Sequence, residues 1–323
     1  MSFARAALLA LSSFVFVACD GARAKEPETP YVVVLGTAQD GGLPQIGCER
    51  ACCERVRAHP ELARRVTSLL LVDPRDGKRW LIDASPDLPE QVASVAGVPP
   101  NRRPAAATGG RPPLFDGIFL THAHVGHYLG LASLGREAYG VVGQTVYATE
   151  RMEDFLCTNG PWSLLVESGG VEVRRVDPGR AVRLADDLVV EALLVPHRDE
   201  FSDTLAFVVR GPDRSLLYLP DIDKWERWGT RIEDVLSDVD VALVDGTFFD
   251  ADELPGRAMS EIPHPFVVES LERFAGLPGS ERAKIRFTHL NHTNPAADPA
   301  SEEAREVERA GLAIAADGER HRL

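Results

Sequence analysis

Three histidines lie within six positions of the stretch FLTHAHVGHYLGL, residues 119–131. His122 and His124 directly follow an apolar run that predicts a buried strand, and side chains two residues apart in an extended chain point to the same side. His127 lies about one helical turn further along the chain. Neutral imidazole is a common ligand of zinc and iron. The spacing therefore predicts that His122 and His124 bind one metal ion and that His127 reaches a neighbouring one.

The ends of later apolar runs supply more candidate ligands. His197 ends the run LLVPH, Asp221 ends LYLPD, and His289 follows the apolar residues of RFTHLNH. Ligands at strand ends are typical of a site built at one rim of a sheet, so we expect these side chains near the first three histidines. His264 stands where the helix predicted in PHPFVVESLERFAG begins, and it is a further candidate.

The elements that must position these side chains indicate one α/β domain. Strand-like apolar runs separated by turn signals extend from YVVVLGT (31–37) to KIRFTHLNH (284–292). Helices are predicted at intervals, over 87–97, 263–276 and 301–311. The sequence has no repeat of solenoid length. We therefore expect a single domain in which helices cover the faces of sheets.

Composition and charge limit the class of partner. The chain has 323 residues, of which 44% are hydrophobic and 26% charged, as is usual for a soluble globular protein. Its net charge of −14 disfavours the sequence-independent binding of nucleic acids, which depends on cationic surfaces. We therefore expect a small-molecule substrate and no nucleic-acid partner.

The first residues are typical of an export signal. The apolar run from Ala6 to Ala18 is too short to span a bilayer comfortably and resembles the core of a signal peptide. The motif FVAC resembles a lipoprotein signal that ends before a lipidated Cys19, and ARA at 22–24 is a competing ordinary cleavage site. We expect a signal peptide over 1–24, a tether over 25–30, and an exported protein that is periplasmic or anchored to a membrane as a lipoprotein. Its membrane contact would come only from that lipid.

The order of these motifs resembles the metallo-β-lactamase superfamily, whose signature H-x-H-x-D-H precedes a distant His, Asp and His. The resemblance covers nearly all of residues 31–323 and implies an αβ/βα four-layer sandwich with metals at one edge. It implies one metal held by the first two histidines of the signature and the next distant histidine, a second metal held by the other two histidines, and an aspartate that bridges them. In this chain the residues are His122, His124 and His197 for the first metal, His127 and His289 for the second, and Asp221 for the bridge.

Two branches of the superfamily resemble this chain in further motifs. LGTAQDGGLPQ and THLNHTNP are similar to motifs of the pyrroloquinoline quinone biosynthesis protein B family. VDGTF and IPHPFVVESL resemble motifs of tRNA 3′-processing nucleases and cyclic phosphodiesterases. In those enzymes the histidine that opens the helix donates a proton at the phosphate, and His264 matches it. The alternative is that His264 is an ordinary residue at a helix N-terminus.

Gly126 departs from the family pattern, which has an aspartate ligand of the second metal at this position. Either one tightly held metal suffices, or another carboxylate takes the place of that aspartate. A third interpretation is that the loop uses the glycine to adopt a positive φ angle. The candidate replacement carboxylates close in sequence to other ligands are Asp199, Asp203 and Asp223.

A cluster of cysteines indicates a second kind of metal site. Cys48, Cys52 and Cys53 lie within six residues, and His292 follows His289 by three. Phosphodiesterase relatives use three cysteines and such a histidine to bind a structural zinc, so the resemblance implies a Cys₃His zinc site here. A disulfide and free thiols remain open as alternatives.

These features together favour a metal-dependent hydrolase of phosphodiesters or esters. A bound metal lowers the pKa of water and polarises a substrate oxygen, Asp221 would orient the water, and His264 would protonate the leaving group. We expect zinc, one or two ions, with manganese or iron as alternatives. Two other functions stay open: a redox or cofactor-biosynthesis enzyme of the pyrroloquinoline quinone type that uses iron, and a non-catalytic metal or ligand carrier at the membrane surface.

Overall fold

The computed structural model describes residues 29–98 and 110–323, which form four layers. Two seven-stranded sheets pack against each other, and helices cover the outer face of each sheet. The α/β sandwich expected from the sequence is confirmed.

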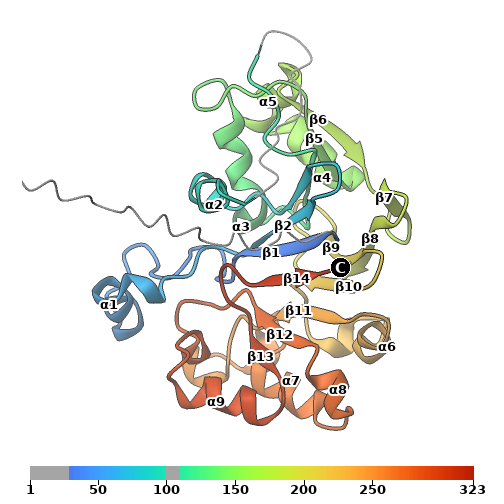
Figure 1. Ribbon diagram of the computed structural model, residues 1–323. Coiled ribbons are helices and arrows are strands. Elements are labelled where there is room, and N and C mark those ends of the chain that lie inside the picture. The colour runs from blue at the N-terminus through green and yellow to red at the C-terminus, as the bar shows by residue number, and fades with distance from the viewer. Residues whose placement is uncertain (1–28, 99–109) are drawn as a thin grey trace, which may run out of the picture.

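The first sheet contains the N-terminal strands and the last strand of the chain, in the order β14-β1-β2-β3-β4-β5-β6. Its strands are β1 (Tyr31–Gly36), β2 (Ser68–Asp73), β3 (Lys78–Ile82), β4 (Gly117–Phe119), β5 (Gln144–Ala148), β6 (Val171–Arg175) and β14 (Arg320–Arg322). The helices within this half of the chain are α1 (Ala51–Ala58), α2 (Leu88–Ser94), α3 (Val125–Tyr128), α4 (Glu150–Thr158) and α5 (Trp162–Glu167). Figure 1 shows α2, α4 and α5 in the upper half of the molecule, with the first sheet.

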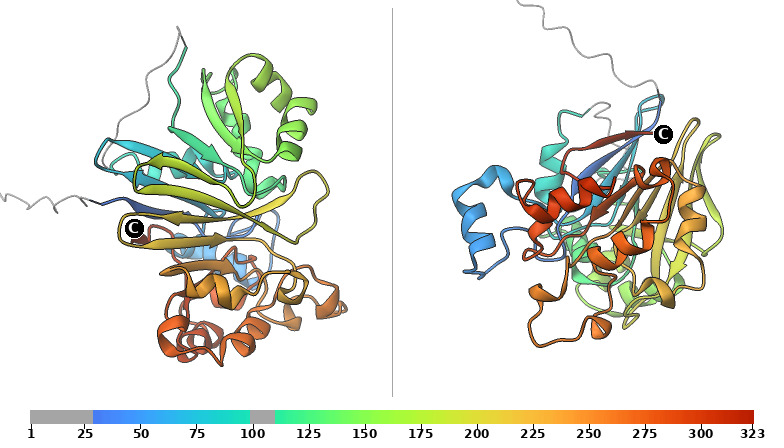
Figure 2. Two further views of the ribbon diagram at one scale, coloured as in Figure 1. Left: turned by 90° about the vertical axis from the view of Figure 1, so that its right-hand side faces the viewer. Right: turned by 90° about the horizontal axis from the view of Figure 1, so that it is seen from below.

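The second sheet has the order β13-β12-β11-β10-β9-β8-β7. Its strands are β7 (Ala181–Ala185), β8 (Leu188–Val195), β9 (Thr204–Arg210), β10 (Ser215–Leu219), β11 (Val241–Asp245), β12 (Ile285–Thr288) and β13 (Ala313–Ile314). The accompanying helices are α6 (Ile232–Ser237), α7 (Val267–Phe274), α8 (Gly279–Arg282) and α9 (Glu302–Arg309). These four helices form the opposite outer layer, in orange and red in Figures 1 and 2.

Strand β1 shows why its sequence is continuously apolar. Val32 and Val34 belong to the hydrophobic core between the two sheets. Tyr31, Val33 and Leu35, which point to the other face, belong to the core between the first sheet and its helices. Because both faces of the strand are buried, alternation of polar and apolar residues is absent from it.

The strand directions bring the candidate ligands to one edge. β1 and β3 run in the same direction because each is antiparallel to β2, and β4 is parallel to β3. In the second sheet β8 and β10 share a direction because each is antiparallel to β9, and β11 and β12 are parallel to β10. The loops that leave the carboxyl ends of these strands carry every residue of the site described below.

Several short elements were not predicted from the sequence. Strands β13 and β14 contain two and three residues, which is too few for a periodic pattern to emerge. Helix α1, which carries Cys52 and Cys53 of the cysteine cluster, has a weakly apolar face with only Cys53 and Val56 buried. Within the described ranges no helix is long and apolar enough to cross a membrane. The predicted signal peptide and Cys19 lie outside those ranges.

Candidate metal centre

Four of the predicted ligands meet in one cluster, here called site A. His122, His124, His197 and Asp221 each offer a ligand atom, and these atoms lie within 4.8 Å of one another. The ring nitrogens His122 Nε2 and His124 Nδ1 are 2.8 Å apart. His122 follows β4, His197 follows β8 and Asp221 follows β10, so three strand ends from both sheets build the site.

A second cluster, here called site B, lies directly beside site A. His127 and His289 meet Asp40, again with ligand atoms within 4.8 Å of one another. Asp221 Oδ2 lies 3.0 Å from His127 Nε2 and 3.2 Å from His289 Nε2. The other oxygen, Oδ1, lies 3.6 Å from His197 Nε2 of site A. The structure thus places Asp221 between the two sites.

Hydrogen bonds from outside the clusters orient three of the histidines. His127 Nδ1 lies 2.7 Å from Asp83 Oδ2, His124 Nε2 lies 2.9 Å from Glu200 Oε2, and His289 Nδ1 lies 2.9 Å from Thr247 Oγ1. Such partners fix the ring orientation and tautomer of metal-binding histidines. Sequence reasoning missed Asp83, Glu200 and Thr247, although Asp83 directly follows the apolar run of β3.

Unsatisfied ring atoms indicate that these clusters fit metal ions. His127 Nε2, His289 Nε2 and both ring nitrogens of His197 are buried and make no well-formed hydrogen bond to any described residue. The same holds for Asp221 Oδ1. A buried polar atom without a partner costs about 1–3 kcal/mol, and so many atoms that face one point need a shared partner. A cation with nitrogen and oxygen ligands is such a partner.

The pKa of His127 is shifted in the opposite direction from those of the other buried ligand histidines. Burial, assisted by the neighbouring histidines, holds the pKa of His122 well below its usual value and lowers that of His197 to about 4. His122 and His197 of site A therefore favour the neutral form, which is the form that binds metal. Burial also disfavours the charged form of His127, but Asp83 and Asp221 outweigh it and raise the pKa of that ring. Burial lowers the pKa of His289, the other ring of site B, so the raised pKa belongs to His127, beside its two carboxylate neighbours.

His264 stands beside Asp221 and is held by a carboxylate of its own. Its Nδ1 lies 2.8 Å from Asp245 Oδ2 and 3.4 Å from Asp221 Oδ1. Burial lowers the pKa of His264, but the Asp245 carboxylate more than compensates and leaves it raised. Thr247 Oγ1 donates to Asp245 Oδ1 over 2.7 Å. Asp245 was not assigned from the sequence, although it is the aspartate of the motif VDGTF.

Two residues at the centre adopt the left-handed backbone conformation without being glycine. Asp83 has φ 66° and His289 has φ 61°. This region is sparsely populated by residues with side chains, and such outliers are frequent at functional sites. Each of them places a polar side chain just beyond a strand end, where a regular strand would have turned it elsewhere.

Asp40 occupies the space beside Gly126 that the family aspartate would need. The Gly126 N–H donates to Asp40 Oδ1 over 3.1 Å, and a Cβ atom added to Gly126 would lie 2.0 Å from that oxygen. Gly126 is not among the glycines with positive φ, so the interpretation based on backbone freedom is wrong. Asp40 was not assigned from the sequence, although it follows β1 in the motif LGTAQDGG.

The three carboxylates suggested from the sequence as replacements are engaged elsewhere. Asp199 accepts a hydrogen bond from Thr204. Asp203 and Asp223 form ion pairs with arginines on the surface, Arg151 and Arg227 respectively. None of the three belongs to a candidate ligand group among the described residues.

The cysteine cluster assembles with a different membership from the one predicted. Cys48, Cys53 and His292 bring their ligand atoms within 4.8 Å of one another, and Cys52 does not belong to this set. All three cysteines are free thiols, so no disulfide joins them. Burial raises the pKa of Cys53 to about 11, while hydrogen bonding from the Arg50 backbone lowers that of Cys48.

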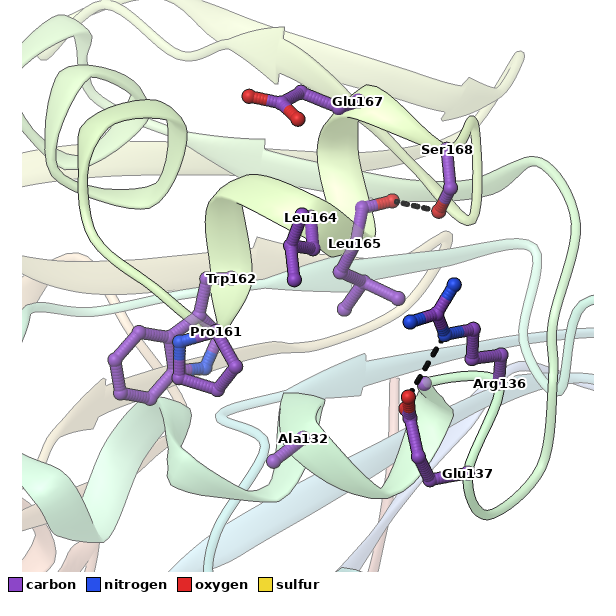
Figure 3. A pocket seen from close by; sticks show the side chains of 10 residues that line it. Ala132, Arg136, Glu137, Pro161, Trp162, Leu164, Leu165, Glu167 and Ser168 are labelled. Carbon is purple, nitrogen blue, oxygen red and sulfur yellow. Dashed lines mark hydrogen bonds and ion pairs between the residues drawn. The ribbon is translucent and has the colours of Figure 1, made fainter.

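A pocket of about 500 Å³ lies apart from these clusters, on the outer side of the first sheet. Figure 3 shows Pro161 and Trp162 on one side of it and the paired Arg136 and Glu137 on another. None of the residues that line it belongs to a candidate ligand group. The chemistry of the chain is therefore concentrated at the sheet edge and not in this pocket.

The family follows from comparison with known proteins. A sequence model described as the beta-lactamase superfamily domain matches residues 78–290, which include every predicted histidine ligand of sites A and B. Coenzyme PQQ synthesis protein B of Methylobacterium radiotolerans is 29% identical over 314 residues, which cover 89% of this chain and 98% of that protein.

Solved structures show the same fold. Zn²⁺-bound PqqB from Methylobacterium extorquens superposes with a TM-score of 0.73 at 24% identity, covering 91% of this chain and 100% of that one. A diphosphatase from the PhnP family superposes with a TM-score of 0.63 at 23% identity, covering 91% and 97%. The chain belongs to the metallo-β-lactamase superfamily, in the branch that resembles coenzyme PQQ synthesis protein B.

Proposed function

We propose that this protein is a metal-dependent hydrolase that directs water to the phosphorus or carbonyl centre of a phosphodiester or ester. The observation that carries this proposal is the convergence of site A and site B, with their unsatisfied buried ring nitrogens, next to the His264–Asp245 pair. A metal ion at such a site lowers the pKa of water and polarises a substrate oxygen. His122, His124 and His197 would hold one ion and His127 and His289 another, with Asp221 shared.

The protein's own side chains account for the proton transfers. Asp221 lies between the two ligand sets, where it can accept a hydrogen bond from the attacking water and orient it. His264 is held through Nδ1 by Asp245, which leaves Nε2 as the ring atom that hands a proton to the leaving group. The Asp245 carboxylate raises the pKa of His264 and so favours the protonated ring that a proton donor needs.

The similar proteins support two candidate functions and suggest the metal. The resemblance to a diphosphatase supports phosphate ester chemistry. The match to coenzyme PQQ synthesis protein B over nearly its full length supports a second candidate, a cofactor-biosynthesis enzyme that uses iron in the same ligand sets. The zinc in the PqqB structure supports zinc for this chain, with manganese and iron as the alternatives to test.

Reconstitution with single metals tests this proposal. The purified protein is stripped with a chelator, loaded with zinc, manganese or iron, and assayed with bis(p-nitrophenyl) phosphate and p-nitrophenyl acetate. We expect turnover with zinc or manganese that His264→Gln lowers about 10²- to 10⁴-fold, the usual contribution of one acid–base group. Turnover dependent on iron and an oxidant would favour the second candidate. Metal binding with no turnover of any probe would instead indicate a carrier.

We also infer a structural zinc held by Cys48, Cys53 and His292, with a fourth ligand from water or from Cys52. These residues tie the loop before β2 to the loop after β12, which are far apart in the sequence. Structural zinc sites use this combination of sulfur and nitrogen ligands. Zinc that remains bound after mild chelation has emptied sites A and B would support the inference, and a disulfide found by mass spectrometry would refute it.

Export and lipidation remain a proposal from the sequence. If Cys19 carries a lipid, the mature protein partitions into detergent with membranes, and Cys19→Ser releases it or leaves it unprocessed. A soluble mature protein that starts at Lys25 would refute lipidation.

A further inference from the structure

We propose that Asp40 is the carboxylate ligand of the metal ion in site B, in the role that the family pattern assigns to an aspartate at position 126. This inference rests on the proposed metal centre and adds a ligand from a part of the chain outside the family's metal-binding motif. The chain would then bind two ions at the sheet edge despite Gly126.

The position of the Asp40 carboxylate supports this role. Its Oδ1 lies 3.9 Å from His127 Nε2, and it shares one ligand group with His127 and His289. Two ligands of one ion are separated by roughly 3–4 Å when each lies about 2.0–2.2 Å from the metal. The side chain is 31% exposed, which leaves it accessible to an ion that enters from solvent.

The backbone fixes Asp40 relative to His289. The Gln39 N–H donates to the Leu290 carbonyl over 2.8 Å, and the Leu290 N–H donates to the Thr37 carbonyl over 2.9 Å. These hydrogen bonds join Gln39, directly before Asp40, and Thr37, three residues before it, to the residue directly after His289. The two ligands are therefore pre-positioned by pairing of the loops after β1 and β12.

Other carboxylates near site B already have different partners. Asp83 binds the opposite nitrogen of the His127 ring, and Asp245 binds His264. Asp221 is shared with site A. Asp40 is the remaining carboxylate that the described residues place in a ligand group with His127 and His289.

Gly126 and Asp40 form a matched pair, because a side chain at position 126 cannot coexist with the Asp40 carboxylate. A Cβ at position 126 would lie 2.0 Å from Asp40 Oδ1 and 2.9 Å from Asp40 Cα. Adding an aspartate at position 126 alone should therefore displace one carboxylate and not add a ligand. Removing the Asp40 side chain removes the 2.0 Å clash, and a small shift of the backbone at position 40 relieves the remaining 2.9 Å approach to its Cα.

Zinc counting after dialysis tests the assignment without any activity assay. Wild type, Asp40→Asn, Gly126→Asp and the double variant Asp40→Gly with Gly126→Asp are loaded with zinc, and bound metal is measured by mass spectrometry and calorimetry. The amide of Asp40→Asn can still accept the Gly126 N–H, so this variant removes the charge and keeps the structural hydrogen bond. Asp199→Asn is the matched control, because within the described part of the chain its carboxylate hydrogen-bonds to Thr204 and lies outside both sites.

We expect Asp40→Asn to hold one zinc fewer than wild type, or to bind the second ion at least about 100-fold more weakly, the upper range seen when partners of ligands are removed. Gly126→Asp alone should also weaken the second ion, the double variant should regain it, and Asp199→Asn should match wild type. Equal zinc content and affinity in wild type and Asp40→Asn would overturn the assignment. Failure of the double variant to regain zinc would overturn the claim that the two carboxylates are interchangeable.

The outcome is separate from the test of hydrolysis. If Asp40→Asn loses an ion while wild type turns over neither probe ester, the assignment of Asp40 stands and the proposed hydrolase function fails. If wild type turns over substrate and Asp40→Asn keeps both ions, the function stands and the assignment fails.

Discussion

Sites A and B lie side by side and share Asp221, but their other ligands have different origins. Site A takes His122, His124 and His197 from the positions that the superfamily pattern specifies. Site B retains His127 and His289, and a carboxylate 86 positions before Gly126 in the chain lies in the place of the family aspartate. The contrast shows that a ligand at a sheet edge can come from another strand end, because many strands deliver their carboxyl ends to the same place.

The two sites also differ in their charge. In site A, His122 and His197 favour the neutral form, and the outer carboxylate Glu200 has a side chain that is 46% exposed. Site B is surrounded by Asp40, Asp83 and Asp221, of which Asp83 is fully buried. A divalent cation at site B would neutralise more buried negative charge, so its loss should disturb the fold more than loss of the ion in site A.

Removing a ligand of site A should have the largest effect on chemistry. His122→Ala deletes a buried ring that belongs to the ligand group of site A and whose pKa is held low by burial. We expect hydrolysis of the probe esters to fall at least about 10³-fold, since activation of water by the metal is lost. Zinc content and kcat are measured together. Zinc content equal to that of wild type would contradict the assignment of His122.

The second largest effect should come from substituting the carboxylates that hydrogen-bond to the ligand histidines, Asp83 at site B and Glu200 at site A. In wild type the Thr121 N–H donates to Asp83 Oδ1. In Asp83→Asn the amide oxygen can accept that same hydrogen bond, which places the amide N–H against His127 Nδ1. That contact leaves the proton of the ring on Nε2, where a metal must bind. We expect about 10- to 100-fold weaker zinc binding at site B by calorimetry.

Glu200→Gln is the matched change at site A. Because Glu200 is half exposed, solvent can replace its contact with His124, and we expect at most a few-fold loss of zinc affinity. If this substitution weakens zinc binding as much as Asp83→Asn does, burial of the outer carboxylate does not distinguish the two sites.

The cysteine cluster tests whether a third metal lies outside both sites. Cys53→Ala should remove one chelation-resistant zinc and lower the melting temperature by several degrees, because structural zinc binding contributes to folding. Cys52→Ala should keep that zinc, because Cys52 lies outside the group formed by Cys48, Cys53 and His292 and water can supply the fourth ligand. Zinc content is measured after mild chelation. Loss of the zinc in Cys52→Ala and not in Cys53→Ala would reverse the assignment.

Substituting Glu253, a buried carboxyl outside both metal sites, should have the smallest of these effects, a change in the free energy of unfolding. Burial raises the pKa of this carboxyl from 4.5 to about 7. Between these values the folded protein binds more protons than the unfolded chain, so this group lowers stability as pH rises. Glu253→Gln can still accept the Phe249 N–H. We expect it to raise the unfolding free energy by about 1–2 kcal/mol at pH 8 and little at pH 4.

Urea unfolding at both pH values measures this change. An equal effect of Glu253→Gln at pH 4 and pH 8 would show that the charge of the carboxyl is not responsible.

Much of site A could be predicted from the sequence, because each of its ligands follows an apolar run that is a recognisable strand. The continuous apolar runs of β1 and β2 predicted sheets covered on their faces, whereas the four-layer arrangement followed from the family resemblance. The role of Asp40 could not be predicted, because it depends on the loop after β1 pairing with Leu290 near the far end of the chain. The sequence also could not show that Cys53 and not Cys52 joins Cys48 and His292, because the orientation of α1 determines which of the two thiols faces them.

The central claim is that two metal ions bind at the sheet edge, with a ligand from Asp40 beside the second. A crystal structure of the zinc-loaded protein, with anomalous scattering recorded at the zinc edge, tests it most directly. We predict two peaks that flank Asp221, with an Asp40 oxygen about 2.0–2.2 Å from the peak beside His127 and His289. A single peak at site A, or two peaks with Asp40 still bonded only to the Gly126 N–H, would contradict it.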